Sequence, residues 1–167
     1  MNQITKPDRF SRENRGFTIV ELLIVVIVFL VIAAIAIPNF LKAKRRMNEA
    51  SAVSSLHTIA VSDVIYSTVY GIGFSNSLAH LAGNLAVPDQ NDAGLIDEVL
   101  ASGTKSGYIF TFTVISTDSS GYVQAYSVNA DPIASGTSGN KHFYMDQTSV
   151  IRFNDSATAG PGDLPIG

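Results

Sequence analysis

The segment RGFTIVELLIVVIVFLVIAAIAIP, which spans residues 15–38, decides how the rest of this chain can fold. Within it, a single acid, Glu21, is followed by the sixteen consecutive apolar residues Leu22–Ile37. The wider region from Phe17 to Leu41 has 25 residues, and as a helix it is long enough to cross a hydrocarbon core of roughly 30 Å. A buried helix of a globular core is rarely so long and so uniformly apolar. The segment therefore predicts a membrane-spanning helix.

Charge is distributed unevenly around this helix. Four basic residues precede the apolar segment and four follow it within residues 42–46, so the positive-inside rule does not orient the helix. From Met47 onward the chain has three basic residues against eleven acidic ones. This acidic composition excludes nucleic-acid binding through bulk charge. The absence of cysteine excludes disulfides, thiolate metal sites and a cysteine nucleophile.

The residues that open the apolar segment form a specific motif. Arg15 and Gly16 precede Phe17 and Thr18, and Glu21 lies four residues beyond Phe17, at the start of the hydrophobic helix. This pattern closely resembles the class III signal of type IV pilins and of the related pseudopilins of type II secretion, and it covers residues 15 to about 40. A conventional secretory signal is a poorer match, because no Ala-x-Ala-like cleavage site follows the apolar run.

The resemblance implies how the segment is processed. A prepilin peptidase would cleave between Gly16 and Phe17 on the cytoplasmic side of the inner membrane. The new amine of Phe17 would then be N-methylated, and the apolar helix would be retained in the mature protein. Residues 1–16 are accordingly interpreted as a leader peptide.

Glu21 and Pro38 are the two residues of this helix that run against its apolar character. A carboxylate inside a bilayer costs about 2.5–3.5 kcal/mol and usually marks a function. In the filament of parallel helices that the resemblance implies, Glu21 would pair with the Phe17 amine of a neighbour and set the register of assembly; alternatively, it stays hydrated at the headgroup boundary. Pro38 matches a proline common in type IVa pilins, and its missing N–H predicts a kink or local unwinding near Ala34–Ile37.

Beyond the membrane segment, the periodicity predicts an amphipathic helix over residues 42–70. The basic residues between Lys42 and Arg46 are expected to touch lipid headgroups or acidic neighbours, with Glu49 as a local partner of Arg45. Gly71 and Gly73 then end the helix. Apolar residues spaced by three and four are expected to form its buried stripe: Met47, Ala50, Val53, Leu56, Ala60 and Val64.

The remainder of the chain predicts a connecting loop followed by a sheet. Residues 71–107 are rich in Gly, Asn and Ser, with short helices expected at residues 78–81 and 95–100, the second capped by Asp92. Alternation of aromatic and β-branched residues predicts an antiparallel sheet of about four strands within residues 108–154, and Gly- and Pro-rich residues 155–167 predict a flexible tail. The fold class is therefore α+β: a long N-terminal helix, half transmembrane (17–41) and half amphipathic (42–70), packed on a C-terminal antiparallel sheet, which is the order of a pilin.

No enzyme active site, cofactor site or metal site is predicted. His57, His80 and His142 are far apart and lack metal-ligand spacing, and no catalytic or nucleotide-binding motif occurs. Aspartates in the C-terminal loops could bind calcium, as in some pseudopilins, although loop aspartates are usually turn formers: Asp131, Asp146 and Asp155.

These observations predict a structural subunit of a type IV pilus. Its partners would be further copies of itself, the prepilin peptidase, the membrane and the inner-membrane assembly machinery, and its filaments would serve processes such as adhesion or twitching motility. The precursor would be a single-pass inner-membrane protein with an extracytoplasmic head, and the assembled subunit would be extracellular. Two alternatives stay open: the major pseudopilin of a type II secretion system, and an uncleaved single-pass membrane protein that displays a binding domain.

Overall fold

The structure is a computed structural model, and it describes residues 16–83 and 87–166. The chain divides into two compact units, with the boundary after Asn39. One long helix, α1 (Ile19–Tyr70), supplies residues to both units, and the second unit also contains two short helices and a six-stranded antiparallel sheet. The predicted α+β class, with a long apolar N-terminal helix and a C-terminal antiparallel sheet, is confirmed.

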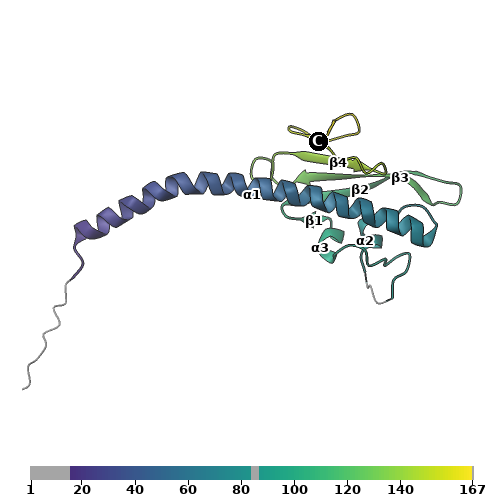
Figure 1. The fold of residues 1–167 in the computed structure, drawn as a ribbon, viewed down its shortest axis with the longest axis horizontal. Helices are drawn as coiled ribbons and strands as arrows, with labels where there is room; N and C mark the ends of the chain where they lie inside the picture. Colours follow the sequence, from purple (N-terminus) through teal and green to yellow (C-terminus); the bar gives the residue numbers. More distant parts are fainter. Residues whose placement is uncertain (1–15, 84–86, 167) are drawn as a thin grey trace, which may run out of the picture. The chain divides into compact units, whose positions relative to one another are not determined.

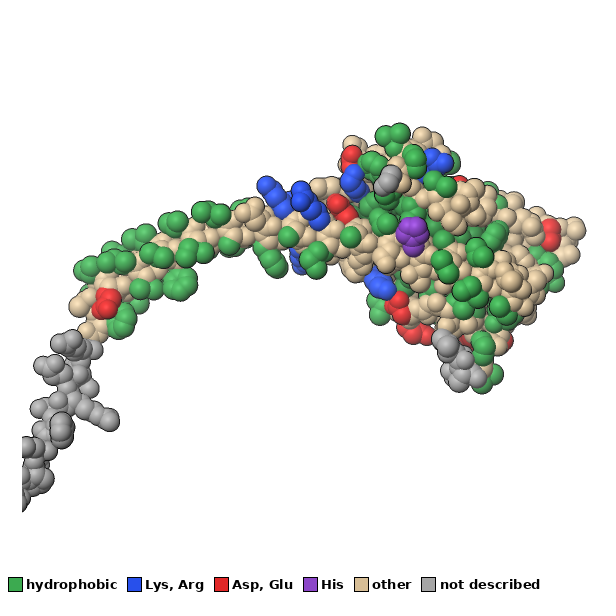
Figure 2. Space-filling view, viewed as in Figure 1, with side chains coloured by type: hydrophobic (Ala, Val, Ile, Leu, Met, Phe, Trp, Pro, Cys, Tyr) green, Lys and Arg blue, Asp and Glu red, His purple; other side chains and the backbone are tan. Residues whose placement is uncertain are grey.

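In the first unit, α1 presents apolar side chains on its whole circumference. Between Leu22 and Ile37 the large apolar side chains are between 42% exposed, at Val25, and 67% exposed, at Phe29. Figure 2 shows these hydrophobic side chains following the N-terminal part of α1. Because a soluble monomer rarely exposes so large a continuous apolar surface, this part of the helix requires lipid or other protein around it.

The second unit is built on a sheet whose strands follow one another in chain order. Its order is β1-β2-β3-β4-β5-β6, and all neighbouring strands are antiparallel. The pairing of β2 with β3 is the longest, running from Tyr108↔Pro132 to Thr117↔Val123. The strands are β1 (Thr104–Lys105), β2 (Tyr108–Thr117), β3 (Val123–Pro132), β4 (His142–Asp146), β5 (Arg152–Asn154) and β6 (Leu164–Pro165).

The sheet extends beyond the predicted one at both ends. The four predicted strands correspond to β2, β3, β4 and β5, and the two-residue strands β1 and β6 are added at the edges. Where a flexible tail was expected after residue 154, the side chain of Asp163 accepts hydrogen bonds from the Gly160 N–H (2.8 Å) and from Asn154 Nδ2 (3.0 Å). Ala159 is buried, and β6 pairs with β5. These contacts order a segment whose Gly and Pro content suggested a loose chain.

The core lies between α1 and one face of the sheet, as Figure 1 shows for the second unit. On β2, Tyr108 and Phe110 are 0% and 4% exposed and face the core, whereas Ile109 between them is 45% exposed. They pack with residues from every part of the head, namely Leu56, Ile59, Leu81, Leu100, Tyr126, Val128, Phe143 and Met145.

The predicted buried stripe of α1 was partly wrong. Leu56 and Ala60 are buried, but Met47 and Val64 are 71% and 50% exposed. The buried face is rotated towards positions that carry small or polar side chains, and it comprises Ala52, Ser55, Leu56, Ile59, Ala60, Ser62, Asp63 and Tyr66. Hydrophobicity alone misplaced the stripe, because half of this face is not strongly apolar.

The connecting segment contains the two short helices, one of them shifted from its expected place. α2 (Leu78–Leu81) matches its prediction and is capped by Ser77. α3 (Glu98–Ala101) begins later than predicted, and its N-cap is Asp97, whose Oδ1 accepts from the Leu100 N–H at 3.0 Å. Asp92, the expected cap, instead lies in a turn, where its N–H donates to Asp89.

Polar contacts between α1 and the loop before β4 fasten the helix to the sheet. Arg45 donates to the Gly136 carbonyl at 2.9 Å, and Asn48 donates to the Ser138 carbonyl at 2.7 Å. Glu49 Oε1 accepts from the backbone N–H of Asn140 at 2.8 Å, so the expected local pairing of Glu49 with Arg45 is replaced by contacts to this loop. We call these contacts the helix clamp.

Gly73 lies where the chain between α1 and α2 passes close to the sheet. Its φ is +82°, and a Cβ atom there would lie 2.2 Å from the Val123 carbonyl oxygen. Gly73→Ala is therefore expected to lower the free energy of unfolding by about 2–5 kcal/mol, through backbone strain and overpacking together. Denaturant unfolding of the full chain measures this loss.

Gly71 provides the matched control for this substitution. Its φ is +66°, but no heavy atom lies within 4 Å of the position that an added Cβ would take, so Gly71→Ala should cost only the backbone strain, about 1–2 kcal/mol. Equal losses for the two variants would contradict the steric explanation.

Candidate functional site

The first turn of α1 is capped by residues of the motif itself. Thr18 Oγ1 accepts a hydrogen bond from the Glu21 N–H at 3.2 Å, and the Thr18 carbonyl accepts the first helical bond, from Leu22, also at 3.2 Å. The Thr-x-x-Glu spacing is that of a capping box. Glu21 is thus the third residue of the helix, where its negative charge interacts favourably with the positive end of the helix dipole.

The Glu21 carboxylate is left exposed by this arrangement. The hydrogen bond to Thr18 uses the backbone N–H of Glu21, and the side chain lies on the surface of the helix among exposed apolar residues. The charge of Glu21 stabilises the start of the helix. Because its carboxylate is exposed, it is also available to a second molecule.

The proposed cleavage junction lies just outside the helix. Gly16 and Phe17 precede Ile19 and have no regular secondary structure, and both are exposed, Phe17 to 74%. No heavy atom lies within 4 Å of the position that a Cβ would take at Gly16. The peptide bond between them is therefore accessible, whereas residues 1–15, which belong to the predicted leader, lie outside the described part of the structure.

Pro38 lies inside α1 without ending it. The helix continues on both sides of the proline, so the unwinding expected near Ala34–Ile37 is not present. The side chain of Asn39 donates to the Ile35 carbonyl at 3.1 Å, next to the position where the proline supplies no N–H. The carbonyl that would have accepted from residue 38 is that of Ala34, so this side-chain bond lies beside the gap left by the proline and does not fill it.

α1 is long and apolar enough to cross a membrane, and no other helix in residues 16–83 and 87–166 is. Its apolar part coincides with the exposed surface of the first unit. Length and composition therefore agree with the predicted membrane segment.

The head contains a buried acid that the sequence pattern did not reveal. Asp63 and Ser75 are both 0% exposed, and Asp63 Oδ1 accepts from the Ser75 N–H at 2.8 Å. Asp63 Oδ2 and Ser75 Oγ have no hydrogen-bond partner in the described part of the chain. Burial raises the pKa of Asp63 to about 6, against the opposing effect of the Ser75 hydrogen bond. The sequence did contain one indication of this burial: Asp63 is spaced by three or four residues from the apolar Ile59 and Tyr66, and so lies on the same face of the helix as they do.

The three loop aspartates considered for calcium do not converge. Asp131 pairs with His142, Asp155 pairs with Lys141 at 3.1 Å, and Asp146 accepts from the Thr148 N–H at 2.9 Å. No group of three or more His, Asp or Glu side chains with a metal-binding arrangement occurs among the residues described. Each aspartate serves a local ion pair or turn instead.

Known proteins resemble this chain both in its N-terminal segment and over most of its length. The family model of the prokaryotic N-terminal methylation motif matches residues 11–37. The type IV major pilin protein PilA of Myxococcus xanthus is 47% identical over 51 residues, which are 30% of this chain but 23% of that protein. The type IV wide pilus major component PilA4 of Thermus thermophilus is 27% identical over 139 residues, which are 83% of this chain and 92% of that protein.

The motif match falls on the capped, exposed start of α1, and the longer alignment also includes most of the head. The chain therefore carries the N-terminal methylation motif and is similar to type IV pilins in its N-terminal helix and over most of its length.

Proposed function

We propose that this chain is the structural subunit of a type IV pilus, which polymerises through its apolar N-terminal helix after the leader is removed between Gly16 and Phe17. The observation that carries the proposal is the exposed apolar surface between Leu22 and Ile37, which opens with the methylation motif. The similarity to PilA and to PilA4, both named as pilus components, supports it.

The exposed helix is suited to two successive environments. In the membrane its side chains face lipid, and in a filament they would face the helices of other subunits. Since lipid tails are about as apolar as leucine, the transfer from lipid to filament gains little from the hydrophobic effect, and association depends on close packing and polar contacts. Inner-membrane assembly machinery would be needed to move the subunit between the two.

Glu21 supplies the polar contact in this proposal. After cleavage, the Phe17 amine is a positive charge at the end of an apolar helix, and the exposed Glu21 carboxylate of a neighbour neutralises it. A buried charge without a partner is strongly unfavourable, so the pair favours one register of neighbouring subunits. Pro38 would kink the helix between its filament half and the half that carries the head.

The role of the head in this proposal is structural rather than catalytic. The precursor would lie in the inner membrane with its leader in the cytoplasm and its head outside, and the mature subunit would be part of an extracellular filament. A type II secretion pseudopilus uses the same motif, so the test must separate the two assemblies.

Mass spectrometry of the purified protein and electron microscopy of the cells test this proposal together. We expect a mature chain that begins at N-methylated Phe17, and surface filaments that are lost on deletion and restored by the intact gene. An intact leader on the accumulated protein would contradict cleavage and support an uncleaved membrane protein. Correct cleavage together with unaffected surface filaments and defective protein secretion in the deletion strain would instead identify a pseudopilin.

A further inference from the structure

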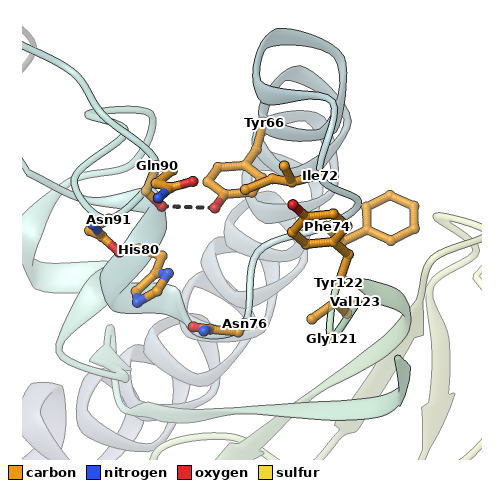
Figure 3. Close-up of a pocket in the computed structure, with 10 residues that line it drawn as sticks. All are labelled: Tyr66, Ile72, Phe74, Asn76, His80, Gln90, Asn91, Gly121, Tyr122 and Val123. Carbon is orange, nitrogen blue, oxygen red and sulfur yellow. Dashed lines mark hydrogen bonds between the residues drawn. The ribbon is translucent and has the colours of Figure 1, made fainter. Parts of the chain in front are cut away.

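A pocket of about 180 Å³ lies in the second unit, near the C-terminal end of α1. Figure 3 shows that its walls come from the last turns of α1, from the segment 72–76, from His80, Gln90 and Asn91, and from the turn between β2 and β3. None of these residues belongs to the N-terminal helix segment or to the helix clamp, so the pocket is separate from the proposed assembly surface.

Aromatic rings form much of the pocket wall, and two of them are held in place. Tyr66 is 3% exposed, and its hydroxyl donates to the Gln90 carbonyl at 2.8 Å, as Figure 3 shows. The Phe74 ring packs edge-on against Tyr126, with 5.1 Å between ring centroids. Tyr122 is 43% exposed and is the aromatic residue most accessible to a ligand.

The polar part of the wall is rich in amides. Asn76, Gln90 and Asn91 each carry a side chain that can both donate and accept hydrogen bonds, and His80 adds an imidazole. No Lys, Arg, Asp or Glu lines the pocket among the residues that the structure describes. A charged ligand such as a phosphate would therefore lack a counter-charge there.

This combination indicates the chemistry of the ligand. A sugar ring has apolar C–H faces that pack on aromatic rings, and hydroxyl groups that both donate to and accept from amides. The volume is below the 300–1,000 Å³ of pockets for drug-sized ligands, so it fits one ring rather than a long oligosaccharide. We propose that this pocket binds a single neutral sugar residue, either free or at the end of a glycan.

Saturation-transfer NMR on the full chain tests this proposal. The protein is kept in a polyoxyethylene detergent, because sugar-based detergents would compete. The probes are the methyl glycosides of glucose, galactose, mannose, N-acetylglucosamine and N-acetylgalactosamine, with glucuronic and sialic acid as charged comparisons. We expect at least one neutral glycoside to bind with a Kd of about 1 mM or tighter. A neutral disaccharide ending in that sugar should bind at least roughly tenfold tighter if a glycan end is the natural ligand, and equally if the free sugar is.

Substitutions in the pocket wall test whether the sugar binds in this pocket. Tyr122→Ala and Asn76→Ala are each expected to weaken binding by about tenfold or more, which is about 1.4 kcal/mol. Ile109→Ala, whose side chain on β2 is 45% exposed, and Asn140→Ala, also exposed, are the matched controls and should leave the Kd within about twofold. Circular dichroism is measured on all four variants to check that each is folded.

Three results would overturn the proposal. One is that none of the five neutral glycosides binds at concentrations up to about 10 mM. Another is that the charged sugars bind as tightly as the neutral ones. The third is that binding survives both pocket variants, because the sugar would then occupy another surface.

Discussion

Glu21→Ala is expected to abolish filaments while the protein still accumulates in the membrane. The substitution removes the carboxylate but keeps the backbone N–H that donates to Thr18 Oγ1, so the helix cap is retained. In the proposed filament, the Phe17 amine of each neighbouring subunit would lose its partner. Removing one member of a buried ion pair costs about 3–5 kcal/mol, and this cost recurs at every subunit.

The measurement is the yield of sheared filaments, with the membrane-bound protein quantified in the same cells. Glu21→Gln separates charge from size, because it keeps the shape of the side chain and should be nearly as defective as alanine. Glu98→Ala, which removes an exposed carboxylate in α3, is the matched control and should assemble normally. Wild-type filament yield from Glu21→Ala would show that Glu21 serves only the helix end.

Asp63→Asn is expected to stabilise the head above pH 6 and to remove most of its pH dependence between pH 4 and 6.5. The pKa of Asp63 is raised by burial from 3.8 to about 6 in the folded protein. Between these values the folded state binds more protons than the unfolded state, so stability falls as pH rises. The loss of stability caused by ionised Asp63 is absent below pH 3.8. Above pH 6 it reaches its full size, about 3 kcal/mol.

An asparagine at this position would fit the surroundings of Asp63 without a charge. Its carbonyl oxygen can still accept from the Ser75 N–H, and its NH₂ group can donate to Ser75 Oγ, which has no partner in the described part of the chain. We therefore expect Asp63→Asn to gain about 1–3 kcal/mol at pH 7.5 and to gain little at pH 4. The pKa of Tyr126 is also raised, first by burial and then by the charge of Asp63. Because the variant lacks that charge, we expect a smaller rise in the pKa of Tyr126.

Denaturant unfolding of the full chain at pH 4, 5.5 and 7.5 measures both effects. Asp155→Asn is the control, because the Asp155 side chain is 66% exposed in its pair with Lys141 and exposed pairs contribute little to stability. If Asp63→Asn were less stable than the wild type at pH 7.5 and its stability depended on pH as before, the burial of a charged Asp63 could not be what destabilises the wild type at that pH.

The sequence predicted the features that depend on local pattern. The apolar run, its motif and the alternation of Tyr108 and Phe110 are all visible within a few residues, because membrane insertion and strand burial select side chains directly. The long helix and four of the six strands were therefore recognised.

Features that depend on partners distant in the sequence were missed. Asp63 was not included in the predicted buried stripe, since nothing nearby in the sequence indicates that Ser75 donates a hydrogen bond to it. The ordered tail depends on Asp163, whose side chain receives bonds from Gly160 and Asn154. A residue's type shows what it can bind, but only the tertiary fold brings the partner within reach.

The helix clamp sets the order in which the head can mature during synthesis. Its hydrogen bonds join residues 90 to 92 positions apart, whereas every strand pairs with its neighbour in the chain. The hairpins can form as the polypeptide emerges, but the clamp cannot close until Asn140 has been made. Loop closure over such a distance is slow compared with local pairing. A translation product that stops before Ala134 would lack the clamp, and its α1 would be held only by contacts made earlier in the chain, such as those of Ser62 with Leu95 and of Tyr66 with Gln90.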